Sequence, residues 1–133
     1  MTSTHSLGGF TLLVTNDKEI ISEIGETLQF GWLSSGFRYC PPGDSVPTII
    51  NLIHPVLLLL DLDEAKNEIQ YLQEIKNAYM IPTMTISSKS DKDISDAALK
   101  NGSLYHFYKP IDRKEIITRY ETFFNFTGKG YLF

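Results

Sequence analysis

The sequence has a single cysteine, Cys40, among its 133 residues, so no disulfide can form within the chain. A domain with one thiol is typical of a reducing compartment, and we expect a cytoplasmic protein. Residues 1–9 contain no basic region followed by an apolar stretch, so no secretory signal is expected.

Long apolar runs and an excess of positive charge are also missing. The longest apolar run, Val56 to Leu60, is far too short to span a bilayer, so no membrane association is expected. The formal net charge is −4, and no basic stripe is present of the kind that binds DNA or RNA. What is present is an apolar content of 42%, enough for one packed core in a chain of this length.

Short apolar segments alternate with amphipathic ones along most of the chain. The run at 56–60 is apolar at every position, which predicts a central strand buried on both faces. This alternation is typical of an α/β fold whose parallel sheet is covered by helices on both sides. The predicted strands are 10–14, 37–40, 56–60, 83–87 and 104–108, each followed by a helix.

The sequence predicts the bounds of the first and last helices. The first is predicted over 18–34, where apolar residues recur at helical spacing. The last is predicted to begin at Asp112, because Glu115 three positions later resembles the second half of a capping box. It is expected to continue to about Phe124.

Polar side chains follow four of the predicted strands. In an open parallel sheet, ligands bind beyond the carboxyl ends of the strands, where the strand order reverses. If the first and third strands are neighbours, the segment 15–17 lies beside Asp61, and Ser87 and Lys109 end the next two strands at the same rim. A carboxylate, a hydroxyl and an ammonium group that converge there are suited to receiving a phosphoryl group. Asp61 would be the nucleophile, and Ser87 and Lys109 would bind the phosphoryl oxygens.

Three of these segments resemble the receiver domain of two-component response regulators. Residues 54–62 are similar to the phosphoacceptor strand of that family, with Asp61 as the acceptor. Residues 81–88 are similar to its fourth strand and place Ser87 at the hydroxyl position. Residues 102–110 resemble its fifth strand, which ends in a lysine that is typically followed by a cis proline.

The resemblance implies an α/β, flavodoxin-like (βα)5 doubly wound domain with a five-stranded parallel sheet in the order 2-1-3-4-5. The receiver domain would span 10–126, with an N-terminal extension at 1–9 and a C-terminal tail at 127–133. His106 stands at the fifth-strand aromatic that moves on activation, so the resemblance makes it the switch residue. A histidine at this position adds a charge that depends on pH.

The resemblance also implies partners. A histidine kinase or a phosphotransfer protein would phosphorylate Asp61, and the domain would signal through a downstream protein by a shift between two packings. The chain would not be an enzyme beyond catalysing its own phosphoryl transfer from a phosphodonor. A homodimer is compatible with this role, and no nucleic acid is expected as a partner.

The chain departs from the family at the acidic pair that holds Mg²⁺. Thr15 and Asn16 occupy those positions, so the remaining metal ligands would be Asp61, Asn16 and the backbone carbonyl of Asp63, with Asp17 if its carboxylate turns inward. A pair of unit charges about 4 Å apart at an effective dielectric near 20 is worth roughly 4 kcal/mol. We therefore expect weakened Mg²⁺ binding.

Two alternatives follow from these departures. The first is a pseudo-receiver, a protein–protein interaction module that acts without phosphorylation; Thr15 and Asn16 favour it. The second is a flavodoxin-like flavin enzyme, which needs a Ser/Thr/Gly-rich phosphate loop after the first strand. Residues 15–19 contain no glycine and carry acids there, so the flavin enzyme is disfavoured.

Overall fold

Strands and helices alternate along the chain as the sequence pattern predicts. The computed structural model describes the backbone of residues 9–30 and 36–132, and the side chains of 9–28 and 36–123. The predicted end of the first helix, at 31–34, lies outside the described residues. The strands are β1 (Thr11–Val14), β2 (Phe37–Cys40), β3 (Leu57–Asp61), β4 (Thr83–Ser87) and β5 (Ser103–Tyr108). The helices are α1 (Lys18–Phe30), α2 (Ser45–Ile53), α3 (Glu68–Ala78), α4 (Lys92–Lys100) and α5 (Arg113–Leu132).

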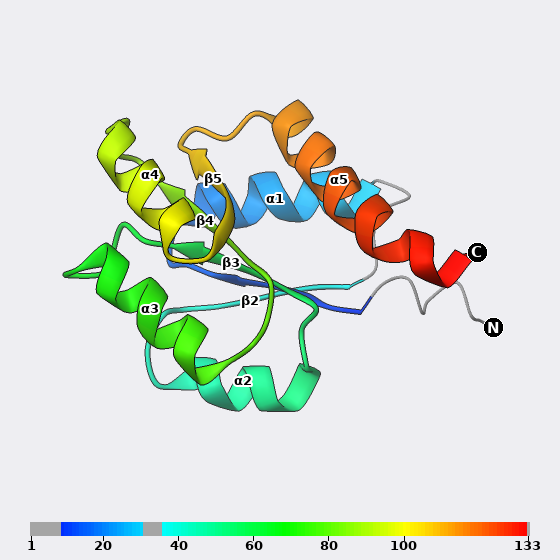
Figure 1. Cartoon of the computed structure of the whole chain (residues 1–133), viewed down its shortest axis with the longest axis horizontal. Coiled ribbons are helices and arrows are strands. Elements are labelled where there is room, and N and C mark those ends of the chain that lie inside the picture. Colours follow the sequence, from blue (N-terminus) through cyan, green and yellow to red (C-terminus); the bar gives the residue numbers. More distant parts are fainter. Residues whose placement is uncertain (1–8, 31–35, 133) are drawn as a thin grey trace.

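The five strands form one parallel sheet in the order β2-β1-β3-β4-β5. Figure 1 shows α1 and α5 together on one side of the sheet and α2 and α3 on the other. The predicted flavodoxin-like fold and its strand order are therefore confirmed. Because β3 lies in the middle and all strands run the same way, the residues that end β1, β3, β4 and β5 meet at one edge.

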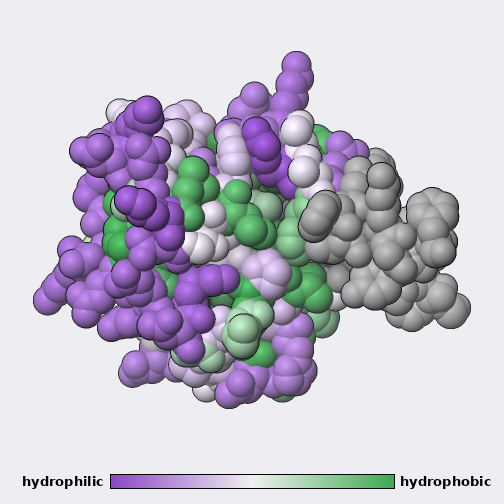
Figure 2. Space-filling view, in the orientation of Figure 1, coloured by the Kyte–Doolittle hydropathy of each residue, from purple (hydrophilic) through white to green (hydrophobic). Residues whose placement is uncertain are grey.

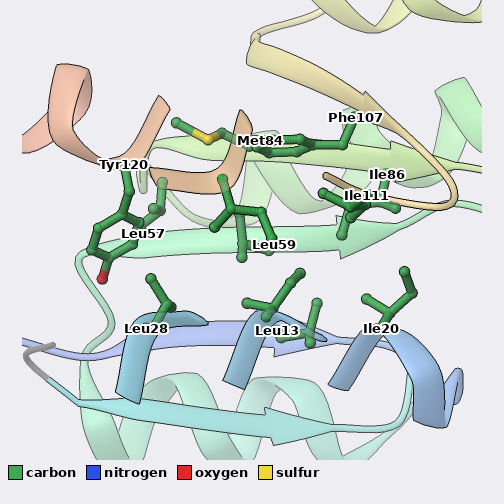
Figure 3. Packing of buried hydrophobic residues seen from close by; sticks show 12 residues of the cluster. Leu13, Ile20, Leu28, Leu57, Leu59, Met84, Ile86, Phe107, Ile111 and Tyr120 are labelled. Atoms are coloured by element: carbon green, nitrogen blue, oxygen red, sulfur yellow. The ribbon is translucent and has the colours of Figure 1, made fainter. Parts of the chain in front are cut away.

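The core is divided by the sheet into two apolar clusters. Alternate residues of β3 enter different clusters: Leu57 and Leu59 pack with α1 and α5, whereas Leu58 and Leu60 pack with α2, α3 and α4. Figure 3 shows the first cluster, in which Leu59 and its neighbours fill the space between the sheet and the two helices. Burial of every residue of β3 holds Asp61, the last one, in a fixed position at the strand end.

The last helix begins where the sequence predicts, but it differs from the prediction in the role of Glu115 and in its end. Asp112 caps it through the backbone N–H of Lys114, 3.1 Å from Oδ1. The predicted capping box is wrong, because the Glu115 carboxylate instead accepts a hydrogen bond from the Tyr105 hydroxyl. The helix continues to Leu132, so its predicted end near Phe124 is also wrong.

In the part of the chain that the structure describes, the exposed large apolar side chains are Tyr39, Leu52, Met80, Leu99, Leu104 and Ile117. The last three lie on the consecutive elements α4, β5 and α5. Figure 2 shows hydrophilic side chains covering most of one face, with apolar atoms near its centre. None of the helices in the described ranges is long and apolar enough to cross a membrane.

Candidate functional site

Asp61 is buried at the carboxyl end of the central strand, and both of its carboxylate oxygens accept hydrogen bonds. Its side chain is 2% exposed. Oδ2 lies 2.6 Å from the Thr15 hydroxyl and 2.8 Å from Lys109 Nζ, while Oδ1 lies 3.0 Å from the backbone N–H of Asp63. Three donors therefore satisfy this buried carboxylate and fix the orientation of its oxygens at the strand end.

Lys109 brings three carboxylates together. Its Nζ lies 2.8 Å from Asp61 Oδ2, and 2.9 Å from Oδ2 of both Asp17 and Asp63. Burial opposes the charge on Lys109, but the hydrogen bonds to Asp61, Asp17 and Asp63 outweigh it and raise the pKa of this lysine above its usual value. The site is thus an ammonium group surrounded by acids that come from two other strand ends. The Lys109–Pro110 peptide bond is cis.

Asp17 turns its carboxylate into the site and also begins α1. Oδ1 accepts hydrogen bonds from the backbone N–H groups of Glu19 and Ile20, as a helix cap does, and Oδ2 pairs with Lys109. The hydrogen bond from Lys109 is the largest cause that lowers the pKa of Asp17. The carboxylate of Asp17 therefore turns inward, which is the condition under which Asp17 was predicted to join the site.

Asn16 does not join this group. Its side chain is exposed and lines a surface hollow with Tyr39 and Pro41, beside the edge of the sheet that carries β2. The contacts of Asp61 come instead from Thr15 on one side of Asn16, while Asp17 on the other side reaches Lys109. The predicted role of Asn16 as a metal ligand has no support from its position.

Asp63 links two loops through its side chain. Oδ2 pairs with Lys109, and Oδ1 accepts the backbone N–H of Ser88 at 2.9 Å. Burial alone would raise the pKa of Asp63, but the hydrogen bonds from Ser88 and Lys109 lower it. The sequence pointed to the backbone carbonyl of Asp63 and gave no role to this carboxylate.

Ser87 lies where the sequence predicts it, at the end of β4 beside β3. It is fully buried, and its hydroxyl oxygen accepts the backbone N–H of Lys89 at 3.0 Å. The backbone carbonyl of Ser87 accepts the N–H of Lys109, which ties the ends of β4 and β5 together. Asp61, Ser87 and Lys109 are thus on three adjacent strand ends, as predicted.

A metal ion fits poorly into this arrangement. Within the described part of the chain, no group of three or more His, Cys, Asp or Glu side chains could hold one. The acids that come closest to such a group, Asp17, Asp61 and Asp63, already share the ammonium group of Lys109. Their negative charge is therefore partly neutralised from within the protein.

Comparisons with known proteins agree with this geometry at the level of the fold. No protein-family model matches the sequence, and no curated protein matches it significantly. Among solved structures, the chain is similar to the receiver domain of the Francisella response regulator 1452, with 19% identity, a TM-score of 0.70, and coverage of 90% of this chain and 99% of that one.

A second similar structure is the signal receiver domain of a DNA-binding response regulator from Colwellia psychrerythraea, with 16% identity, a TM-score of 0.71, and coverage of 85% and 98% of the two chains. A third is the BeF3-activated DrrB receiver domain, with 17% identity, a TM-score of 0.69, and coverage of 89% and 98%. This chain has the fold of a response-regulator receiver domain.

In this receiver fold, His106 is a buried residue with 4% exposure. Its Nδ1 lies 2.7 Å from the Thr85 hydroxyl, which is also 2.9 Å from the Ser103 hydroxyl. Ser103 donates to the carbonyl of Tyr105, so it must accept from Thr85, and Thr85 must then accept from His106. Nδ1 of His106 therefore carries a proton, and the buried Nε2 has no hydrogen-bond partner among the residues that the structure describes. The role of His106 as a switch stays a prediction.

No pattern in the sequence indicated that Thr85 and Ser103 form hydrogen bonds around His106. A strand alternates its side chains between faces, so Ser103 and His106, three positions apart, should point to opposite sides. An irregularity in the pairing of β4 with β5 aligns Thr83 with Ser103 and Thr85 with His106. The extra residue brings both side chains to the same face, where Thr85 bonds to each.

Proposed function

We propose that this chain is a phosphoacceptor receiver domain in two-component signal transduction. Asp61 receives a phosphoryl group from a histidine kinase or a phosphotransfer protein, and a downstream protein reads the result. The observation that carries the proposal is the ion pair of 2.8 Å between Asp61 and Lys109 at the end of the central strand in a receiver fold. A carboxylate nucleophile held against a lysine ammonium group at one edge of the sheet is suited to bind and receive an anionic group.

In the transfer, an oxygen of the Asp61 carboxylate forms a bond to phosphorus while the bond from phosphorus to the donor nitrogen breaks. The donor imidazole leaves with the electron pair of that bond. Lys109 is close enough to Asp61 to bind an oxygen of the phosphoryl group, and Ser87 lies on the strand end between them. The chain does no other chemistry in this proposal.

Mg²⁺ has a minor place in the proposal. The side chains present do not form a site for tight Mg²⁺ binding, since Lys109 already neutralises part of the charge of Asp61 and Asp63. We therefore propose weak binding at most, and no step depends on it. The single cysteine, Cys40, favours a reducing compartment, so we place the proposed phosphoryl transfer in the cytoplasm.

The surface formed by α4, β5 and α5 is the proposed contact for the downstream protein. The exposed side chains of Leu99, Leu104 and Ile117 support this choice, because large apolar groups on neighbouring elements favour a protein partner over water. Figure 2 shows apolar atoms among hydrophilic ones near the centre of the view. A second copy of the chain is one partner that the same surface would suit.

A pseudo-receiver that acts without phosphorylation is the second candidate. Thr15 favours it, because a hydroxyl bonded to Asp61 stands where an acid that attracts Mg²⁺ is expected. In this reading the network around Lys109 serves to hold the fold, and the surface of α4, β5 and α5 binds its partner at all times.

Intact-mass measurement after incubation with acetyl phosphate and Mg²⁺ separates the two candidates. A phosphoacceptor gains one phosphoryl mass while acetate leaves, and Asp61→Asn abolishes the gain. Asp96→Asn, which changes an exposed acid on α4, is the matched control and keeps it. A folded wild-type protein that gains no mass at high Mg²⁺ and also binds no beryllofluoride identifies a pseudo-receiver.

A further inference from the structure

The Asp63 carboxylate occupies two donors that an anion on Asp61 needs. Oδ2 lies 2.9 Å from Lys109 Nζ, and Oδ1 lies 2.9 Å from the backbone nitrogen of Ser88. Lys109 is also 2.8 Å from the Asp61 oxygen, so the ammonium group stands between the two carboxylates. The backbone of Asp63 stays next to Asp61 through a separate hydrogen bond of 3.0 Å from its N–H to Oδ1.

A phosphoryl group on Asp61 would compete with Asp63 for these donors. Its oxygens are anionic acceptors, as carboxylate oxygens are, and both are stabilised by charged and backbone N–H donors. Lys109 Nζ already has three carboxylate partners, which matches the three protons of an ammonium group. Two of these contacts are hydrogen bonds, to Asp17 and Asp61, and the third is a close ion pair with Asp63, so an incoming anion must compete with these carboxylates for Lys109.

Asp63 is the carboxylate that can leave with the least disruption. Asp17 is held at its other oxygen by two backbone N–H groups of α1, and Asp61 is buried. The Asp63 side chain is 22% exposed and belongs to the loop between β3 and α3. It can rotate into solvent while its backbone N–H keeps its bond to Asp61.

We propose that Asp63 is a built-in anion that blocks the phosphoryl site, an autoinhibitory contact that must be displaced before Asp61 is phosphorylated. The inference rests on the proposed phosphoacceptor function and specifies how that site is regulated. The incoming group takes over Lys109 and the Ser88 N–H, and Asp63 turns outward. The loop between β4 and α4, which Asp63 holds through Ser88, is thereby coupled to the occupancy of the site.

Removing the carboxylate of Asp63 tests this proposal. Asp63→Ala frees both donors, and Asp63→Asn keeps the size of the side chain but removes its charge. Glu64→Gln is the matched control, since it removes an exposed acid from the next position. Two measurements are made on each full-length protein: the rate of labelling of Asp61 by acetyl phosphate, and the affinity for sulfate from the chemical shift of the Ser88 amide. Sulfate binding requires no phosphoryl transfer.

Both Asp63 variants should be labelled about tenfold faster than wild type and bind sulfate about tenfold more tightly, a change of about 1.4 kcal/mol. Glu64→Gln should change neither value by more than about twofold. If the variants bind sulfate more tightly but no protein is labelled, the block by Asp63 stands and the phosphoacceptor function is wrong. If the folded variants bind sulfate no better than wild type, Asp63 does not occupy the anion site and the inference is overturned.

Discussion

The Thr15 hydroxyl donates a hydrogen bond of 2.6 Å to Oδ2 of Asp61 across the two central strands of the sheet. The pairing of Val14 with Leu60 brings these two residues together, since each follows directly after a paired position. Thr15 is 1% exposed and its oxygen also accepts the backbone N–H of Asp17. One hydroxyl thus positions the proposed nucleophile and shapes the loop that supplies a second acid.

Thr15→Val should destabilise the domain at pH 7. The change keeps the shape of the side chain but leaves a buried carboxylate with one donor fewer, which costs about 1–3 kcal/mol. Urea unfolding followed by circular dichroism measures the loss. Thr122→Val on α5, where the hydroxyl bonds to the carbonyl of Thr118 on the exposed side of the helix, is the control and should lie within about 0.5 kcal/mol of wild type. Equal stability of the two variants would contradict the role given to Thr15.

Lys109→Met should reduce the free energy of unfolding much more than Thr15→Val does. It removes the cation that lies between Asp17, Asp61 and Asp63, and removing one partner of a buried ion pair destabilises a protein by about 3–5 kcal/mol. Acid should reduce the difference from wild type. Lys109 lowers the pKa of Asp17 and helps to lower that of Asp63, so its contribution is present above the usual value of 3.8 and is lost as the pH falls through the lowered values.

Urea unfolding at neutral and acidic pH measures the effect of Lys109→Met. Lys114→Met, at an exposed position of α5, controls for the loss of a positive charge. A deficit that stays constant between pH 7 and the acid range would show that the lysine acts by packing rather than by its charge.

His106 should make the domain less stable as the solution becomes mildly acidic. Burial lowers the pKa of His106 below 6.5, and the attraction of Asp63 only partly offsets this. Between the two pKa values the unfolded chain binds more protons than the folded one, so stability is full above 6.5 and falls as the pH drops below it. His106→Phe and His106→Gln should both remove this part of the pH dependence. If either variant retains it, another group is responsible.

Nitrogen NMR of His106 should find the proton on Nδ1 and a bare Nε2 at neutral pH. The position of the proton follows from the series of hydrogen bonds through Thr85 and Ser103, because Ser103 donates to a carbonyl oxygen that can only accept. Thr85→Val removes the acceptor and should abolish this preference. A proton on Nε2 in the wild type would contradict this assignment, because Thr85 would then have to donate to Nδ1 and Nε2 would need an acceptor.

Most of the fold could be predicted, because local patterns indicated the strands and helices and the resemblance to receiver domains implied the strand order. The apolar run before Asp61 identified the central strand, and the polar residues after each strand identified the edge with the site. Gly102, with a φ of +107°, ends α4 where the sequence has its Asn-Gly pair. The error at α5 has a different origin. The Glu115 side chain accepts a hydrogen bond from the hydroxyl of Tyr105 on β5 and does not cap its own helix.

Three site residues were predictable for the same reason. Asp61, Ser87 and Lys109 each follow an apolar strand, and parallel strands necessarily bring such ends together. The direction in which a side chain turns is not fixed by this rule. Asn16 and Asp17 are neighbours in the sequence, yet one faces solvent and the other reaches Lys109.

The sequence by itself determined the alternation of elements, the central place of β3 and the meeting of an acid, a hydroxyl and a lysine at one edge of the sheet. These follow from burial and from the period of the side chains. Only the tertiary structure decided that Asp63 shares the donors of Asp61 and that Thr85 joins Ser103 to His106. Such contacts depend on strand register and on rotation about single bonds, and these are set by packing between segments far apart in the chain.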